Sequence, residues 1–380
     1  MATHHRVRAG ALLCCLGLAV PGLGACQEAG PTRPVAPSRA ESAAEAGGMA
    51  ALVKAAKKEG RLNTIALPRQ WANYGGLIDG FEKKYGIKVV VDNPNGHSSQ
   101  EIDALKRYRG QRRAPDVIDV GDTFAQSAAR HNLLTPYRVA QFDEIPPEQK
   151  DAEARWYNNY GGYISIGCDA ARVRTCPESF ADLLRPEYKG LVSMNGEPTA
   201  AGSAFAAVYA ATLANGGSFD NIRPGIDFFA RLDKSGNYNR ADPTRAAIAK
   251  GSTPISIEWD YLNLQHIDQL HGTGVNWKVS IPFDGSFSQY YAQAVNKNAP
   301  HPAAARLWEE YLFSPEGQNL RLVDYARPVL MAVMAKHGTL NKALAARLPT
   351  VEGTPQFPTE AQLNTALRTV REDWAKSVGD

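Results

Sequence analysis

Short apolar runs alternate along this chain with longer segments in which apolar residues recur at helical spacing. Spacings of three and four predict helices, and runs of five or six apolar residues bounded by Gly or Pro predict strands. In the first third, these are a helix at 49–59, a strand at 62–67, a helix at 77–85, a strand at 87–91, a helix at 99–109, a strand at 115–120 and a helix from residue 122. Such alternation indicates βαβ crossovers and an open, mostly parallel sheet.

A second alternating region begins with an apolar strand at 160–167. Further strands are predicted at 191–194, 254–259, 279–282 and 290–296, with helices from 204, at 226–232 and at 243–250. The last part is mostly helical, at 301–313, 315–321 and 359–376. The fold class is therefore α/β. Ligands of such sheets bind beyond the C-terminal strand ends, where the loops with Trp71 and Asp122 lie.

Residues 188–209, YKGLVSMNGEPTAAGSAFAAVY, read as a strand, a loop and a helix. Thr199, Gly202 and Ser203 stand where the loop enters the helix-favouring alanine run. Unpaired backbone N–H groups at a helix start, with two hydroxyls beside them, suit an anionic group. The alternative is that Thr199 or Ser203 only caps the helix.

The N-terminus has the pattern of an export signal. A basic stretch with Arg6 and Arg8 precedes an apolar segment at 11–20, which is too short to span a bilayer. Leu-Gly-Ala-Cys at 23–26 resembles a bacterial lipobox, in which Cys26 is lipidated and becomes the new N-terminus. We therefore expect a signal peptide at 1–25 and a flexible tether, rich in Ala, Pro, Ser and Gly, at 26–48.

Composition and charge narrow the function classes. The 380 residues allow two domains, and a formal net charge of +3 gives no reason to expect nucleic acid as a partner. Export into an oxidising compartment leaves Cys168 and Cys176 as the remaining cysteines, and we predict that they form a disulfide. Two buried free thiols are the alternative.

Several blocks resemble the extracytoplasmic solute-binding proteins of ABC importers. They are the lipobox, PDVIDVGDTFAQSAARHNLLTPY, SFADLLRPEYKGLVSMNGEPTAAGSA, NAPHPAAARLWEEYLFSPEGQ and ARPV, in order over about residues 50–335. The resemblance is to the group that binds ferric iron, polyamines, thiamine and phosphorylated compounds. It implies the type II periplasmic-binding-protein fold, in which crossover strands join two lobes that close on a ligand. The first lobe would comprise 49–160 and 288–380, and the second 161–287.

The same resemblance implies the partners. They are a small-molecule solute and an ABC permease with its ATPase, and the protein would be a monomer without a cofactor. Its place would be the periplasm or another extracytoplasmic face of a bacterial membrane, held by the lipid anchor.

Polyamine-binding relatives enclose an ammonium group with aromatic rings and carboxylates. Trp259 falls where such relatives often have an aromatic residue, with Glu258 and Asp260 beside it, and a Trp face beside a carboxylate suits a cationic amine. An amino-bearing anion could use Trp259 or Asp260 together with the helix start at Ser203. The predicted ligand-binding residues are Trp71, Asp122, Tyr160, Thr199, Gly202, Ser203, Trp259, Asp260 and Tyr290.

Two alternatives stay open from the sequence. Ferric iron is one, although Trp259-Asp260-Tyr261 stands where iron-binding relatives have adjacent tyrosines, so that one phenol of the pair is missing. Tyr290 and Tyr291 would point to opposite faces of a strand. The other is an exported hydrolase that uses Glu258 and Asp260 as paired carboxylates. The expected protein is not an enzyme, and no catalytic residue or resident metal is predicted.

Overall fold

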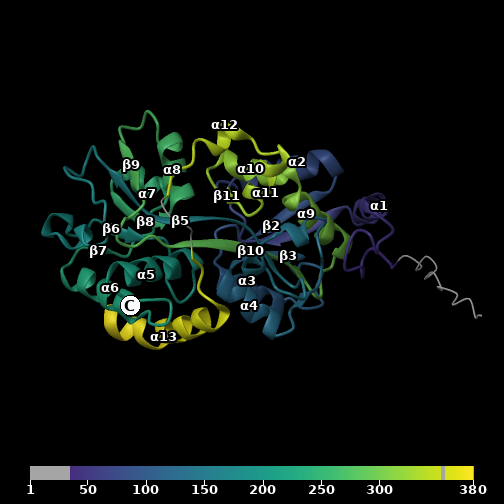
Figure 1. Cartoon of the computed structure of the whole chain (residues 1–380), viewed down its shortest axis with the longest axis horizontal. Helices are drawn as coiled ribbons and strands as arrows, with labels where there is room; N and C mark the ends of the chain where they lie inside the picture. Colours follow the sequence, from purple (N-terminus) through teal and green to yellow (C-terminus); the bar gives the residue numbers. More distant parts are fainter. Residues whose placement is uncertain (1–34, 352–355, 380) are drawn as a thin grey trace, which may run out of the picture. The chain divides into compact units, whose positions relative to one another are not determined.

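The computed structural model of the protein describes residues 35–351 and 356–379, in which helices flank a two-stranded and a nine-stranded sheet (Figure 1). The strands are β1 (Arg61–Ile65), β2 (Lys88–Asp92), β3 (Val117–Gly121), β4 (Leu134–Thr135), β5 (Tyr157–Asp169), β6 (Val192–Met194), β7 (Tyr238–Asn239), β8 (Ile255–Trp259), β9 (Trp277–Ser280), β10 (Ser288–Asn296) and β11 (Arg327–Pro328). The α-helices are α1 (Met49–Glu59), α2 (Tyr74–Tyr85), α3 (Ser98–Arg107), α4 (Asp122–Arg130), α5 (Gly202–Ala214), α6 (Arg223–Lys234), α7 (Arg245–Lys250), α8 (Asp260–Gln269), α9 (Pro302–Phe313), α10 (Pro315–Val323), α11 (Met331–His337), α12 (Lys342–Ala345) and α13 (Glu360–Val378).

Two long strands, β5 and β10, connect the two alternating regions. The first half of β5 pairs with β10 and β11, and its second half, from Ile164, pairs with β8 and β9. Parallel pairs join β1 to β2 and β6 to both β7 and β8, where strand and helix alternate in the sequence. Both crossover strands pair antiparallel with their neighbours. The predicted two-lobe α/β fold is confirmed, while the exact lobe boundaries at 160 and 287 stay a proposal.

At Gly161 and Gly162 of β5, neighbouring groups leave no room for a side chain. A Cβ atom on Gly161 would lie 2.3 Å from the carbonyl oxygen of Gln289, and one on Gly162 would lie 2.2 Å from Asp260 Oδ1. Asp260 cannot yield cheaply, because the same oxygen accepts hydrogen bonds from the backbone N–H groups of Tyr163 and Tyr261.

We therefore expect Gly162→Ala to lower the free energy of unfolding by about 2 kcal/mol through steric conflict. Thermal and urea denaturation measure this loss. Gly86→Ala is the matched control, since Gly86 has φ +68° and open space around it, so that variant reports backbone strain alone. If Gly162→Ala unfolds no more easily than the wild type, the close approach at the crossover is not rigid.

The described half of the predicted tether, residues 35–48, packs against the rest of the chain. Arg306 Nε donates to the carbonyl oxygen of Ala40 at 2.7 Å, and the Arg138 N–H donates to the carbonyl oxygen of Glu41 at 2.6 Å. The side chains of Ala40 and Ala46 are buried. The predicted signal peptide and the lipidation site at Cys26 lie outside the described residues.

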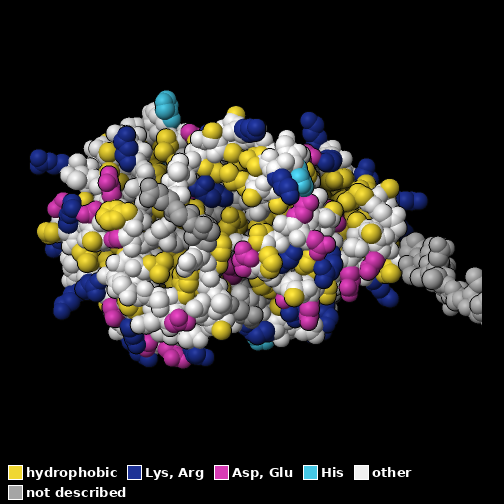
Figure 2. Space-filling model, in the orientation of Figure 1, with side chains coloured by type: hydrophobic (Ala, Val, Ile, Leu, Met, Phe, Trp, Pro, Cys, Tyr) yellow, Lys and Arg dark blue, Asp and Glu magenta, His cyan; other side chains and the backbone are white. Residues whose placement is uncertain are grey.

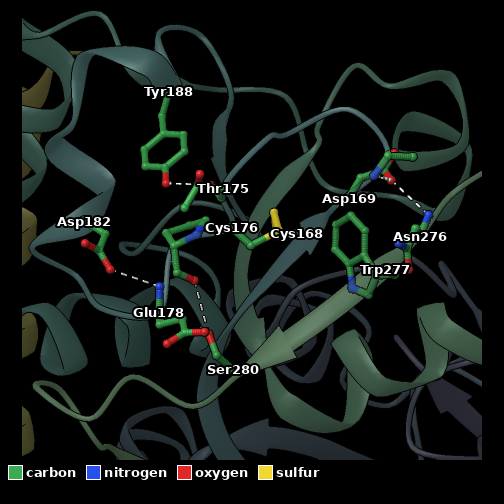
Figure 3. The surroundings of a disulfide bond; sticks show 12 residues. Cys168, Asp169, Thr175, Cys176, Glu178, Asp182, Tyr188, Asn276, Trp277 and Ser280 are labelled. Carbon is green, nitrogen blue, oxygen red and sulfur yellow. Dashed lines mark hydrogen bonds between the residues drawn. A yellow bond between two sulfur atoms is a disulfide. The ribbon is translucent and has the colours of Figure 1, made fainter.

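The structure joins Cys168, near the end of β5, to Cys176 in the following loop, as the sequence predicts (Figure 3). Tyr188 fixes the same loop, because its hydroxyl donates to the Thr175 carbonyl oxygen at 2.8 Å. Ser280 on β9 donates to the carbonyl oxygen of Pro177 at 3.3 Å. The disulfide and these hydrogen bonds hold the loop against the nine-stranded sheet.

Removal of this bridge in a Cys168→Ser, Cys176→Ser double variant is expected to lower the free energy of unfolding by about 2–3 kcal/mol, because a short covalent loop is opened in the unfolded chain. Urea denaturation of the wild type with and without a reductant gives the same comparison without mutation. If a reductant lowers the free energy of unfolding of the wild type but not that of the double variant, the loss of stability is due to the disulfide.

The C-terminal helix α13 packs along α6 and reaches α4 (Figure 1). Asp373 pairs with Arg223 at 2.7 Å, Trp374 packs on Phe229, and Asn364 accepts from Arg130 at 2.9 Å. The helix thus touches both alternating regions. These contacts favour assigning α13 to both lobes rather than to the first lobe alone.

Acidic and basic side chains are interspersed over the face shown in Figure 2, in keeping with the small net charge. No helix within residues 35–351 and 356–379 has the length and apolar character that a membrane span requires.

Candidate functional site

A small inner cavity lies where the start of α3 meets the start of α5. Its volume is about 50 Å³. The residues around it are Ala66, Pro68, Trp71, Gly96, His97, Ser98, Glu101, Asp119, Asn195, Ala201, Gly202, Ser203 and Tyr291. They come from both alternating regions of the chain, so the cavity lies between the lobes.

A larger outer cavity of about 460 Å³ continues from the inner one. The two share Pro68, Trp71, Gly96, His97 and Asn195. The outer cavity adds polar side chains of α8 and of the loop before α7, together with Glu258 of β8. A volume of this size is that of a small-molecule site, whereas the inner cavity admits only one compact group.

The start of α5 presents an unpaired hydroxyl group to the inner cavity. The N-cap is Ala201, which makes no side-chain capping bond, so neither Thr199 nor Ser203 caps this helix. Ser203 is 2% exposed and its hydroxyl oxygen has no hydrogen-bond partner within the described structure. Backbone N–H groups of a first helical turn lack partners inside the helix and carry the positive end of its dipole.

The starts of α3 and α5 are in direct contact. The Ser99 N–H points at the carbonyl oxygen of Ala200 at 3.5 Å, and a Cβ on Gly196 would lie 3.7 Å from His97 Cε1. At the far side, a Cβ on Gly121 would lie 3.4 Å from the Cα of Gly202. The starts of both helices therefore border the same small space, where each contributes the positive end of its dipole.

Two carboxyl groups also face this space. Glu101 of α3 is 2% exposed, and its Oε2 accepts from the backbone N–H of Asp119 at 3.0 Å. Burial raises the pKa of Asp119 to about 6, against the opposing effects of Arg321 and of the hydrogen bond from the Tyr160 hydroxyl. Burial, reinforced by Asp119, raises the pKa of Glu101 well above its usual range.

An aromatic cluster forms the base of the inner cavity. Trp71 packs edge-on against Tyr261 and Tyr291, with ring centroids 5.9 and 5.6 Å apart, and Tyr160 stacks on Tyr291. Trp259 stacks on Tyr261. The structure thus brings together three predicted wall residues, but only Trp71 lines the cavities. Tyr160 stands behind it and accepts a hydrogen bond from Trp71 Nε1 at 2.8 Å.

The other predicted residues lie apart from both cavities. Asp260 is buried, and its carboxylate pairs with Arg327 at 3.1 Å, so the amine partner predicted for it is replaced by a guanidinium. Tyr290 points away from Tyr291, toward Phe357, and burial raises its pKa to about 12.

Asp122 begins α4, where Gln289 Nε2 donates to its Oδ2 at 3.3 Å and burial raises its pKa to about 7. Thr199 is half-buried in the loop before α5 and borders neither cavity. Of the nine predicted positions, Trp71, Gly202 and Ser203 are those that line a cavity.

A polar wall in the outer cavity is centred on Glu258, which is 1% exposed. Its Oε2 accepts from Asn195 Nδ2 at 2.8 Å, and its Oε1 lies 3.2 Å from both Ser256 Oγ and His266 Nε2. Because Glu258 faces this cavity while Asp260 pairs with Arg327, the two carboxylates do not flank one site as a paired hydrolase mechanism requires.

Sequence reasoning missed most of the inner cavity. Tyr291 could have been predicted, because side chains alternate along β10 and Tyr291 therefore points to the face opposite Tyr290. His97-Ser98-Ser99-Gln100 is a helix-start signal, and it marks a second N-terminus that could join Ser203. Glu101 and Asp119 carry no local signal, since their meeting depends on the packing of α3 on β3. In the described ranges, His, Cys, Asp and Glu form no group of three or more that could hold a metal ion.

Solved structures share this fold at low sequence identity. A periplasmic binding protein, AfuA of Actinobacillus pleuropneumoniae with fructose-6-phosphate bound, is 18% identical with a TM-score of 0.62, covering 84% of this chain and 98% of that chain. The apo ferric ion-binding protein A of Pasteurella haemolytica is 20% identical with a TM-score of 0.60, covering 82% and 97%. A putative spermidine/putrescine ABC transporter protein of Listeria monocytogenes is 14% identical with a TM-score of 0.62, covering 82% and 99%. A comparison with curated proteins found no match.

Fold and cavities together define a two-lobe α/β protein built to hold a small solute. The chain belongs to the bacterial extracellular solute-binding protein family, whose model matches residues 112–349. The family resemblance read from the sequence blocks is thereby confirmed.

Proposed function

We propose that this protein captures a small organic solute with an anionic group, such as a phosphate, phosphonate or carboxylate, and delivers it to an ABC permease. The observation that carries the proposal is the buried hydroxyl of Ser203 without a partner, at the start of α5, in a cavity that the start of α3 also faces. A helix start alone would be weak support. The buried hydroxyl of Ser203 beside it, however, has no hydrogen-bond partner among the described residues, and a buried hydroxyl group requires one.

The sizes of the cavities divide the ligand into two parts. The inner cavity, at about 50 Å³, has room for a compact anionic head, and the outer cavity, at about 460 Å³, has room for the remainder. Glu258, Asn195 and His266 line the outer cavity and suit hydroxyl or amino groups. An amino-bearing anion or a sugar phosphate satisfies both parts, and fructose-6-phosphate is the ligand of one structural neighbour.

A polyamine and ferric iron remain the competing ligands, because structural neighbours include a ferric ion-binding protein and a putative spermidine/putrescine transporter. A polyamine would need carboxylates at both ends; Glu258 supplies one in the outer cavity, and Glu101 and Asp119 border the inner cavity. For iron, the hydroxyl of Tyr291 in the inner cavity is the available phenol. Neither ligand gives a partner to the Ser203 hydroxyl and the two helix starts.

Isothermal titration against fructose-6-phosphate, 2-aminoethylphosphonate, putrescine, spermidine and ferric citrate tests the proposal. We expect micromolar or tighter binding of a phosphorylated or phosphonylated compound and a ligand-dependent rise in melting temperature without turnover. Tight binding of spermidine or iron with no response to any anion would refute it. Formation of a product would instead support a hydrolase.

We further propose that the protein is a monomer attached to the membrane through lipid on Cys26, on the extracytoplasmic side. Its support is the leader and lipobox pattern. Mass spectrometry of the N-terminal peptide from a membrane fraction would show a diacylglyceryl mass on Cys26. A Cys26→Ser variant is expected in the soluble fraction, and retention of that variant in the membrane would count against the anchor.

A further inference from the structure

The carboxyl group of Glu101 borders the inner cavity in which we propose that the anionic group of the solute binds. Its protonation state therefore affects the affinity for the anion. The carboxyl group of Asp119 borders the same inner cavity of about 50 Å³. No Lys or Arg is among the residues around that cavity in the described chain. Two ionised carboxylates that border so small a space repel each other, and at least one of them takes a proton.

The surroundings of the two groups decide which one is ionised. The Asp119 carboxylate accepts from the Tyr160 hydroxyl at 2.7 Å and from Gln293 Nε2 at 2.5 Å. The guanidinium of Arg321, fully buried over the Tyr160 ring, also favours the charge on Asp119. Glu101, by contrast, accepts a hydrogen bond from the backbone N–H of Asp119 at 3.0 Å and lies near no Lys or Arg among the described residues around the cavity. The proton therefore belongs on Glu101, in agreement with the raised pKa that burial gives this carboxyl group.

We propose that Glu101 binds the anionic head of the solute as a neutral acid, donating its carboxyl proton to it, so that the site accepts a fully ionised anion only while Glu101 is protonated. This inference rests on the proposed anion-binding function and adds its regulation by pH. Above the pKa of Glu101 the same residue becomes a negative charge against the anion. Capture is then favoured at lower pH, and a rise in pH promotes release.

The other titratable groups that face Glu101 are Asp119 of β3, His97 at the start of α3 and Tyr291 of β10. Asp119 changes charge near pH 6, and a protonated His97 would also attract an anion. Burial raises the pKa of Tyr291 above its usual range, so this phenol stays neutral throughout. The test must therefore separate Glu101 from Asp119 and His97.

Inorganic sulfate is the suitable probe, because its charge does not change between pH 5 and 9. Sulfate affinity of the full-length protein is measured by titration calorimetry across this range for the wild type, Glu101→Gln, His97→Asn and Asp119→Asn. In the wild type, affinity should fall up to tenfold per pH unit above the pKa of Glu101, with uptake of about one proton per sulfate. Glu101→Gln, whose amide donates at every pH, should bind sulfate without this decline, whereas the other two variants should keep most of it.

The outcomes separate this inference from the function on which it rests. If sulfate and fructose-6-phosphate bind but Glu101→Gln keeps the wild-type pH slope, the role of Glu101 is refuted and anion capture stands. If sulfate, fructose-6-phosphate and 2-aminoethylphosphonate all fail to bind the wild type at pH 5, and no carboxylate binds either, both proposals fail. Proton uptake in two buffers of different ionisation enthalpy checks the assignment, since a purely structural Glu101 would leave that uptake unchanged in Glu101→Gln.

Discussion

Ser203→Asp is expected to weaken anion binding by about 100-fold or more, equivalent to about 2.7 kcal/mol. The change places a carboxylate where the hydroxyl of Ser203 now faces the inner cavity without a partner. A negative side chain there neutralises the positive end of α5 and repels the head group of the solute. Calorimetric titration with whichever anion binds the wild type measures the loss.

Two further variants separate the causes. Ser203→Ala removes one hydrogen bond to a charged group and should cost about tenfold in affinity. Ser252→Asp adds the same charge at an exposed position outside both cavities and should bind like the wild type. If Ser203→Asp binds anions as tightly as Ser252→Asp, the assignment of the anion site to the start of α5 is wrong.

Arg327→Met is expected to lower the free energy of unfolding by about 3–5 kcal/mol, because it leaves the carboxylate of Asp260 buried without its counter-ion. Arg327 Nη2 lies 3.1 Å from Asp260 Oδ2, and the Asp260 side chain is fully buried. The pair joins the short strand β11 to the start of α8 beside the crossover at Gly162. Urea denaturation gives the magnitude.

The double variant Arg327→Met, Asp260→Asn is the control for this prediction. Asparagine retains an oxygen for the N–H groups of Tyr163 and Tyr261 but carries no charge. It should therefore recover part of the stability that Arg327→Met loses. Equal instability of the single and double variants would mean that lost packing of the Arg327 side chain, and not the buried charge, causes the effect.

The alternation of apolar and amphipathic stretches was sufficient to predict the α/β fold, because βαβ units follow from local periodicity. It failed at α8, where the buried face carries Asn263, Gln265 and His266 and so resembles a polar surface. It also could not show that β5 and β10 pair antiparallel as crossovers, since that depends on contacts between residues far apart in the sequence.

The site shows the same limit at the level of single side chains. Ser203 was found because an unpaired helix start is a local feature of the chain. Trp259 and Asp260, which the sequence favoured, lie one and two residues after Glu258, which is the residue of this segment that faces the outer cavity. Glu101 and Asp119 lie on separate elements, and only packing brings their carboxyl groups together.

The position of α13 has a consequence for how readily the solute can leave. Any swing of one half away from the other must part Asn364 from Arg130 of α4 or Asp373 from Arg223 of α6, because α13 contacts both helices. These two contacts would therefore favour the arrangement in which the halves lie together over arrangements in which they are parted. Affinity and dwell time of the solute would both depend on a segment that never touches it.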